Sequence, residues 1–110
     1  MSALNWNQEL EKLKTLENNW DSYGSPPPND ASIELARRAA TQFDKLLGKV
    51  DGVGPVADGG AICCSGKFIV ECFNSGEAVI GHCPDGGKIG VWEVESDLEK
   101  EMSDRINASS

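Results

Sequence analysis

Apolar side chains recur at helical spacing in the N-terminal half of the chain. Successive positions are three or four residues apart, as along one face of an α-helix: Ile33, Ala36, Ala40, Phe43 and Leu47. Asn29 and Asp30 are suitable N-caps, and Gly48 stands where a C-cap glycine belongs. We therefore predict a helix over residues 30–47.

Leucines near the N-terminus form a second, shorter stripe. Leu10, Leu13 and Leu16 are three residues apart, and Asn5 or Ser2 can cap the start of a helix that contains them. We predict this helix over residues 4–18.

A third stripe lies near the C-terminus. Leu98, Met102 and Ile106 are four residues apart, which gives a narrow apolar seam. Ser96 is the expected N-cap, and Glu99, three residues later, completes a capping box. The pattern predicts an acidic helix over residues 96–106.

Between these helices the pattern changes to short apolar runs separated by turn residues. The runs fall at residues 61–64, 68–73, 78–83 and 89–94. Connections this short join antiparallel neighbours, so the segment 61–94 predicts a four-stranded antiparallel meander. A short edge strand at 55–57 is an alternative for the glycine-interrupted connection that precedes it.

These elements define an α+β fold in a single domain over residues 1–110: two N-terminal helices, the meander and a C-terminal helix. Alternation along the strands leaves apolar side chains on both faces of the sheet. We expect one face to take the helix over 30–47 and the other to be covered by the first or last helix. An uncovered apolar face would mark an association surface, such as that of a homodimer.

Composition limits the classes of function. The 110 residues are 39% hydrophobic and carry a net charge of −8, which excludes a fully disordered chain and disfavours direct binding to nucleic-acid phosphates. This charge suits a basic protein partner, or solubility alone. An apolar run long enough for a membrane span is missing, as is a signal-peptide pattern, so we expect a cytoplasmic protein that does not bind membranes.

Four cysteines and one histidine are the candidates for metal or thiol chemistry: Cys63, Cys64, Cys72, Cys83 and His82. They form no Cys-x-x-Cys pair, and adjacent strand residues point to opposite faces, so we interpret the cysteines as small core residues and expect no cofactor. The alternative is a metal site built from Cys63, Cys72, His82 and Cys83. A further alternative is a nucleophilic cysteine, in which Cys72 and His82 form a pair across the hairpin.

Acidic residues crowd the C-terminal part of the chain. The ordinary interpretation is a solvated helix face, and the sharper one is a negative patch that docks on a basic protein or imitates nucleic-acid phosphates. Glu99 and Glu101 are the candidate binding residues of such a patch. The sequence carries no recognisable catalytic motif, so we do not expect an enzyme.

The most distinctive local string lies in residues 19–28, between the first two helices. We interpret it as a folded corner in which Trp20 and Tyr23 pack on the core, Asp21 accepts backbone N–H bonds and Gly24 takes a positive φ. The alternative is a binding site made by Trp20, Asp21 and Tyr23, because aromatic side chains dominate interface hot spots.

This string resembles a corner found in a family of small proteins from bacteria, phages and mobile elements. The family combines a Trp-Asp-x-Tyr-Gly corner with a following proline and, further on, an Asp-Gly-Gly strand entry, which match residues 20–24, 26–28 and 58–60 here. The resemblance spans about residues 10–94. Family members usually end the first strand of the meander in tryptophan, whereas this chain has Ile62-Cys63-Cys64.

The resemblance carries no assigned activity or catalytic residues. It implies an accessory setting, such as a toxin–antitoxin partner or a phage- or cassette-borne modulator. Together with the charge and the apolar strands, it favours a non-enzymatic module that binds a protein partner, with the metal- or thiol-dependent protein and the phosphate-mimicking inhibitor as alternatives.

Overall fold

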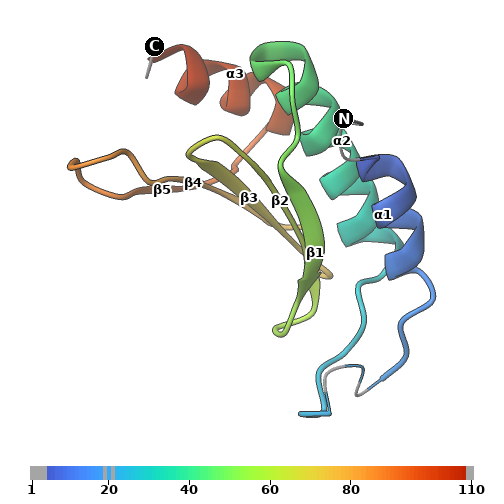
Figure 1. Cartoon of the computed structure of the whole chain (residues 1–110). Coiled ribbons are helices and arrows are strands. Elements are labelled where there is room, and N and C mark those ends of the chain that lie inside the picture. Colours follow the sequence, from blue (N-terminus) through green and yellow to red (C-terminus); the bar gives the residue numbers. More distant parts are fainter. Residues whose placement is uncertain (1–4, 19, 21, 109–110) are drawn as a thin grey trace.

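The computed structural model describes residues 5–18, 20 and 22–108. They form three helices and a five-stranded antiparallel sheet (Figure 1). The elements follow one another as α1 (Trp6–Leu13), α2 (Asp30–Leu47), β1 (Gly52–Val56), β2 (Gly60–Ser65), β3 (Phe68–Phe73), β4 (Ala78–His82), β5 (Gly90–Glu93) and α3 (Leu98–Ala108). The strands lie in sequence order, so the sheet is a meander, and the α+β class is confirmed.

The three helices lie on the same side of the sheet (Figure 1). Burial alternates along the central strand β3: Phe68, Val70 and Cys72 point toward the helices and are buried, whereas Ile69 and Phe73 point away and are half-buried. The expectation that a helix covers the second face is therefore wrong for the described part of the chain. Both α1 and α3 pack beside α2 and leave that face open.

Helix α2 is the central element of the buried side. It begins and ends as predicted, because Asn29 and Ser32 cap its start reciprocally and Gly48 adopts a left-handed conformation at its end. Its buried stripe, which includes Ile33 and Phe43, packs on β2 and β3. Burying each such large side chain contributes roughly 1.5–3 kcal/mol.

The outer helices differ from their predicted ranges: α1 spans Trp6–Leu13 instead of 4–18, and α3 spans Leu98–Ala108 instead of 96–106. Helix α1 ends at Leu13, because the next N–H groups bond to carbonyls three residues back and the Thr15 hydroxyl donates to the Lys12 carbonyl at 2.7 Å. Helix α3 is capped by Asp97 rather than Ser96: the Asp97 side chain accepts from the Glu99 N–H at 3.1 Å, and the Asp97 carbonyl accepts from Glu101.

The sheet has one strand more than the predicted four. Strand β1 pairs along its whole length with β2, from Gly52 opposite Cys64 to Val56 opposite Gly60. This strand is difficult to predict from the sequence, because its glycines and proline give no alternation of apolar and polar side chains. Of the edge strand suggested at residues 55–57, Pro55 and Val56 belong to β1, and Ala57 follows its end.

Asn74, in the turn between β3 and β4, joins segments that are distant in the sequence. Its side-chain oxygen accepts from the Asn29 N–H at 2.9 Å and from the Ser32 hydroxyl at 2.8 Å, and its amide group donates to the Pro27 carbonyl at 3.0 Å. Its backbone N–H donates to the Gly59 carbonyl at 2.9 Å. The start of α2 is thus fixed to two turns of the sheet.

Replacing Asn74 should destabilise the protein strongly. In Asn74→Ala, the Pro27 carbonyl loses its donor, and the Asn29 N–H and the Ser32 hydroxyl keep only their bonds within the capping box, so we expect the free energy of unfolding in urea to fall by about 1–3 kcal/mol. The control Asn18→Ala alters an exposed asparagine beyond the end of α1 and should stay within about 0.5 kcal/mol of wild type. Equal stability of the two variants would contradict the role of Asn74.

Candidate functional site

The face of the sheet that points away from the helices carries apolar side chains that no helix of the described chain covers. Alternation along the strands assigns it glycines at positions 52, 54, 60 and 81 and two acidic residues, Glu71 and Glu93. Its apolar side chains are Val56, Ile62, Cys64, Ile69, Phe73, Val79 and Val91. We refer to this set of strand residues as the open face.

The register of the strands places the two carboxylates among apolar neighbours. Glu71 of β3 lies between Ile62 of β2 and Val79 of β4, and Val79 in turn lies beside Glu93 of β5. All strand positions of the open face are described, and none of them is Lys or Arg. The open face therefore combines an apolar surface with negative charge.

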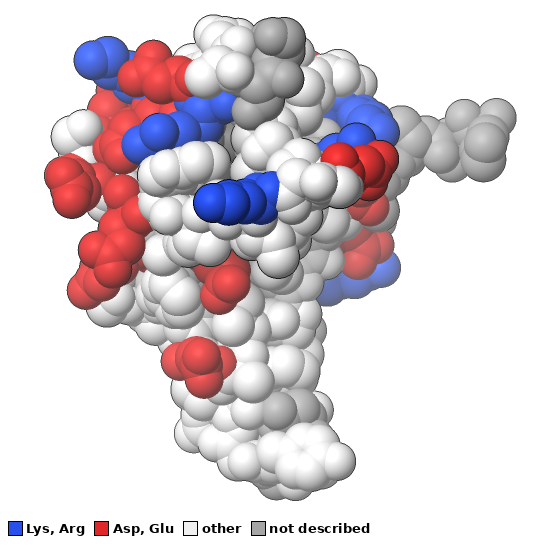
Figure 2. Space-filling model, turned by 90° about the vertical axis from the view of Figure 1, so that its left-hand side faces the viewer, with Lys and Arg blue, Asp and Glu red and all other residues white. Residues whose placement is uncertain are grey.

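The exposure of the open face increases toward β5. Ile62, Ile69 and Val79 are half-buried by their neighbours, whereas Val91 is 64% exposed and Ile89, just before β5, is 70% exposed. Figure 2 looks at the side that lies to the left in Figure 1: its lower part is mostly uncharged with separate acidic side chains, and basic side chains lie higher up. The surface is suited to a partner that covers apolar groups and supplies cations.

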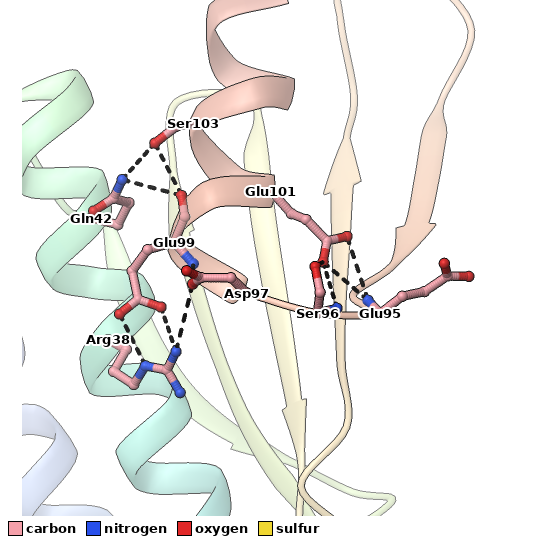
Figure 3. A network of polar contacts seen from close by, with 8 residues as sticks. All are labelled: Arg38, Gln42, Glu95, Ser96, Asp97, Glu99, Glu101 and Ser103. Atoms are coloured by element: carbon pink, nitrogen blue, oxygen red, sulfur yellow. Dashed lines mark hydrogen bonds and ion pairs between the residues drawn. The ribbon is translucent and has the colours of Figure 1, made fainter.

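Glu99, one of the predicted binding residues, is engaged within the fold (Figure 3). Its carboxylate accepts two hydrogen bonds from the Arg38 guanidinium, one of them from Nε at 3.1 Å, and Arg38 also approaches Asp97 at 4.0 Å. The hydrogen bonds from Arg38 lower the pKa of Glu99 from its ordinary value. Beside them, Gln42 donates to the Glu99 carbonyl at 3.2 Å and to the Ser103 hydroxyl, so this network joins α2 to α3.

Glu101, the other predicted acidic binding residue, closes the loop before α3. Its carboxylate accepts from the Ser96 N–H at 2.9 Å and from the Glu95 N–H at 3.1 Å, and these bonds lower its pKa (Figure 3). The structure brings Glu99 and Glu101 into the same region but gives both carboxylates intramolecular partners. These contacts favour a structural role for both residues, and their role in docking stays a prediction.

The corner predicted in residues 19–28, called the Trp corner below, is only partly as predicted. Trp20 is half-buried and donates from Nε1 to the Pro26 carbonyl at 2.9 Å, and Gly24 has the expected positive φ of 82°. Tyr23 is 90% exposed, so its predicted packing on the core is wrong. Both neighbours of Tyr23 have a positive φ, 66° at Ser22, and this backbone turn directs the tyrosine outward. Asp21 lies outside the described residues.

The cysteines are spread over the sheet. Cys63 and Cys72 are buried under the helices, Cys64 lies on the open face, and Cys83 is exposed after β4. Burial raises the pKa of the Cys72 thiol to about 12 and also raises those of Cys63 and Cys64. These environments disfavour the thiolate that nucleophilic chemistry needs.

The register of the strands contradicts the alternative in which Cys72 and His82 form a pair. The register of β3 and β4 places Cys72 opposite Ala78, whereas His82 lies opposite Phe68 at the other end of the hairpin and stacks on its ring at 4.3 Å between centroids. Within the described part of the chain, no group of three or more His, Cys, Asp or Glu residues is arranged to hold a metal ion. The alternative set Cys63, Cys72, His82 and Cys83 is accordingly dispersed.

Two further observations bear on the class of protein. Among the described residues, no helix is long and apolar enough to cross a membrane. Comparisons with protein-family models, curated proteins and solved structures find no match to this chain. The alternation of side chains predicted apolar groups on both faces of the strands, but no local signal distinguishes Ile69, Glu71 or Val91 as candidate residues.

The four thiols should differ in reactivity as their burial differs. With iodoacetamide under native conditions, Cys83 should be alkylated first. The alkylation rates of Cys63 and Cys72 should be lower by a factor of roughly 100 or more, because reaction at these sites requires opening of the sheet. Peptide mass spectrometry of timed samples measures the order. In guanidinium chloride the rates should converge; native alkylation of Cys72 as fast as that of Cys83 would contradict the burial.

The Arg38–Glu99 pair should stabilise the protein in a pH-dependent way. Each side chain of the pair is about 40% exposed, so solvent screens it, and Glu99→Gln should lower the free energy of unfolding at pH 7 by about 0.5–1 kcal/mol. Because the pKa of Glu99 is lowered in the folded state, the contribution is present above the ordinary value near 4.5 and lost as the pH falls through the lowered pKa. Urea titrations at several pH values measure this difference.

The matched control for Glu99→Gln is Asp104→Asn, which removes an exposed charge from the same helix. Asp104→Asn should have little effect on the free energy of unfolding at any of these pH values. A difference between wild type and Glu99→Gln that stayed constant down to acid pH would rule out the ion pair as its source.

Proposed function

We propose that this protein is a non-enzymatic module that binds a protein partner through the open face. The observation that carries the proposal is the placement of α1, α2 and α3 on the same side of the sheet, which leaves an apolar face uncovered (Figure 1). Apolar surface of this kind is stabilised when a partner removes it from water, by roughly 25 cal/mol for each Å² buried.

The charges of the open face support a basic partner. Glu71 and Glu93 lie among apolar side chains, and covering them removes water from their carboxylates. This desolvation is unfavourable unless a Lys or Arg of the partner pairs with each carboxylate. The net charge of −8 adds long-range attraction for a basic protein, so the encounter should be faster at low salt.

A second copy of this chain is less suitable as a partner for the open face than a basic protein. Glu71 lies in the middle strand of the sheet, so a two-fold face-to-face arrangement would bring the two Glu71 carboxylates toward each other. The open face offers no cation to compensate them. We therefore propose a complex with a different protein rather than a homodimer.

The setting that we propose is cytoplasmic and accessory. The four cysteines are free thiols rather than disulfides, which suits a reducing compartment. The resemblance of the Trp corner to small proteins of bacteria and mobile elements supports an accessory partner in such a system.

A selection experiment with charge-reversed variants tests the proposal. A phage-displayed library of random twelve-residue peptides is selected on the wild-type protein, and the binders are measured on Glu71→Lys and Asp104→Lys. Both substitutions change the net charge equally, but only Glu71 lies on the open face. We expect peptides rich in Lys, Arg and apolar residues, with affinity at least tenfold weaker for Glu71→Lys, which is about 1.4 kcal/mol, and little changed for Asp104→Lys.

Two outcomes would overturn the proposal. One is a set of binders that respond equally to both substitutions, because their attraction would then reflect net charge alone. The other is a concentration-dependent homodimer whose formation Glu71→Lys strengthens, measured by analytical ultracentrifugation.

A further inference from the structure

The two edges of the sheet differ in how they are protected. Edge strands expose backbone N–H and C=O groups that can pair with another chain, and proteins usually block them with proline, lysine or a covering element. Strand β1 contains Pro55, which has no N–H, and α1 packs on it. Strand β5 (Gly90–Glu93) contains neither proline nor lysine.

From this difference we propose that an extended segment of the partner adds to the free edge of β5 as a sixth strand. The inference rests on the proposed function, because it specifies how the same partner is held beside the open face. It goes further by naming the backbone groups and the side-chain pattern that recognise the partner.

The register of β4 and β5 identifies the free backbone groups. The Val94 N–H donates to the Ala78 carbonyl at 2.9 Å, so these residues form a hydrogen-bonded pair. Such pairs alternate in an antiparallel ladder, so the next ones toward the hairpin loop are Trp92 with Ile80 and then Gly90 with His82. The N–H and C=O groups of Val91 and Glu93 therefore point away from β4, toward the free edge.

The helical side of β5 is already occupied. The ring of Trp92 lies against Gly90, where a Cβ atom would come within 2.5 Å of the ring. The guanidinium carbon of Arg105 from α3 lies 4.4 Å from the centre of the same ring. This cation–π contact closes the inner side of the edge. On the opposite side of β5, the exposed Val91 and Glu93 are available to the side chains that an added strand directs to the open-face side.

The exposed side chains beside the edge define what the added strand should carry. Val91 is 64% exposed and shares the open-face side with Glu93, and Ile89, just before β5, is 70% exposed. A partner strand would therefore have an apolar residue next to Val91 and, two positions further, a Lys or Arg next to Glu93. The loop between β4 and β5 reaches out beyond the helices, which leaves the edge accessible (Figure 1).

A second copy of β5 fits this edge less well than a basic segment does. Self-pairing would join two chains of net charge −8 and add the carboxylates of Glu93 and Glu95 from both copies without a cation on β5 to pair with them. An extended segment with alternating apolar and basic side chains on one face satisfies the free backbone groups and the charge together.

A synthetic strand tests the inference. The probe is a nine-residue peptide with threonine at every odd position and valine and lysine alternating between them, so that valine and lysine share one face. Hydrogen exchange of the protein amides is followed by NMR with and without the peptide. We expect exchange at Val91 and Glu93 to slow roughly tenfold or more, whereas Gly90 and Trp92, which already pair with β4, should change little.

Two variants complete the test. Val91→Pro removes an N–H that points to the free edge and breaks no bond to β4, so it should weaken peptide binding at least tenfold, about 1.4 kcal/mol, while the spectrum stays folded. A probe N-methylated at its valines and lysines should bind as weakly to wild type.

The outcomes separate this inference from the proposed function. Peptide binding that depends on Glu71 but leaves exchange at Val91 and Glu93 unchanged would overturn strand addition and keep the open face as the contact surface. Protection of these two amides in the protein alone, increasing with its concentration, would overturn the inference in favour of self-pairing. Retained binding by Val91→Pro and by the N-methylated probe would also overturn it.

Discussion

The hydrogen bonds of the Asn74 side chain fix where α2 meets the sheet, and the other helices depend on that position. The oxygen of Asn74 accepts from Asn29 and Ser32 at the start of α2, and its nitrogen donates to Pro27 in the segment before it. Once α2 is anchored at the turn between β3 and β4, its buried stripe follows β2 and β3. Since α1 and α3 both pack beside α2, the same anchor leaves the opposite face of the sheet open.

The residues that carry the family resemblance meet around this anchor. Trp20 donates to the Pro26 carbonyl, and Gly59 lies so close to Pro26 and Asn74 that a Cβ atom would approach them to 3.0 and 3.1 Å. A side chain at Gly60 would collide with the Cys72 carbonyl. The corner and the Asp-Gly-Gly turn are thus explained by close packing and do not by themselves identify a ligand site. The family resemblance and the accessory setting that it implies stay predictions.

Two pairs of acidic residues have different physical roles. Glu99 and Glu101 satisfy a guanidinium and backbone N–H groups, so their charge stabilises the joint between α2, α3 and the sheet. Glu71 and Glu93 lie on strands whose neighbours on the same face are apolar. Net charge alone cannot distinguish these groups, because both contribute equally to it. Only the second group lies on the open face, where the proposed partner would bind, and Glu93 alone lies in the edge strand β5, where strand addition is proposed.

Elements with local signals could be predicted from the amino-acid sequence. The caps and apolar stripe of α2, the turns of the meander and the alternation along β3 depend on neighbouring residues, so they could be predicted from the chain. The sequence by itself could not determine β1, whose glycines and proline lack a pattern, or the exposure of Tyr23, which follows from backbone turns. Both faces of the strands carry apolar groups, so the choice of the covered face required the tertiary structure. The long-range hydrogen bonds of Asn74 and the packing of α1 and α3 on α2 decided it.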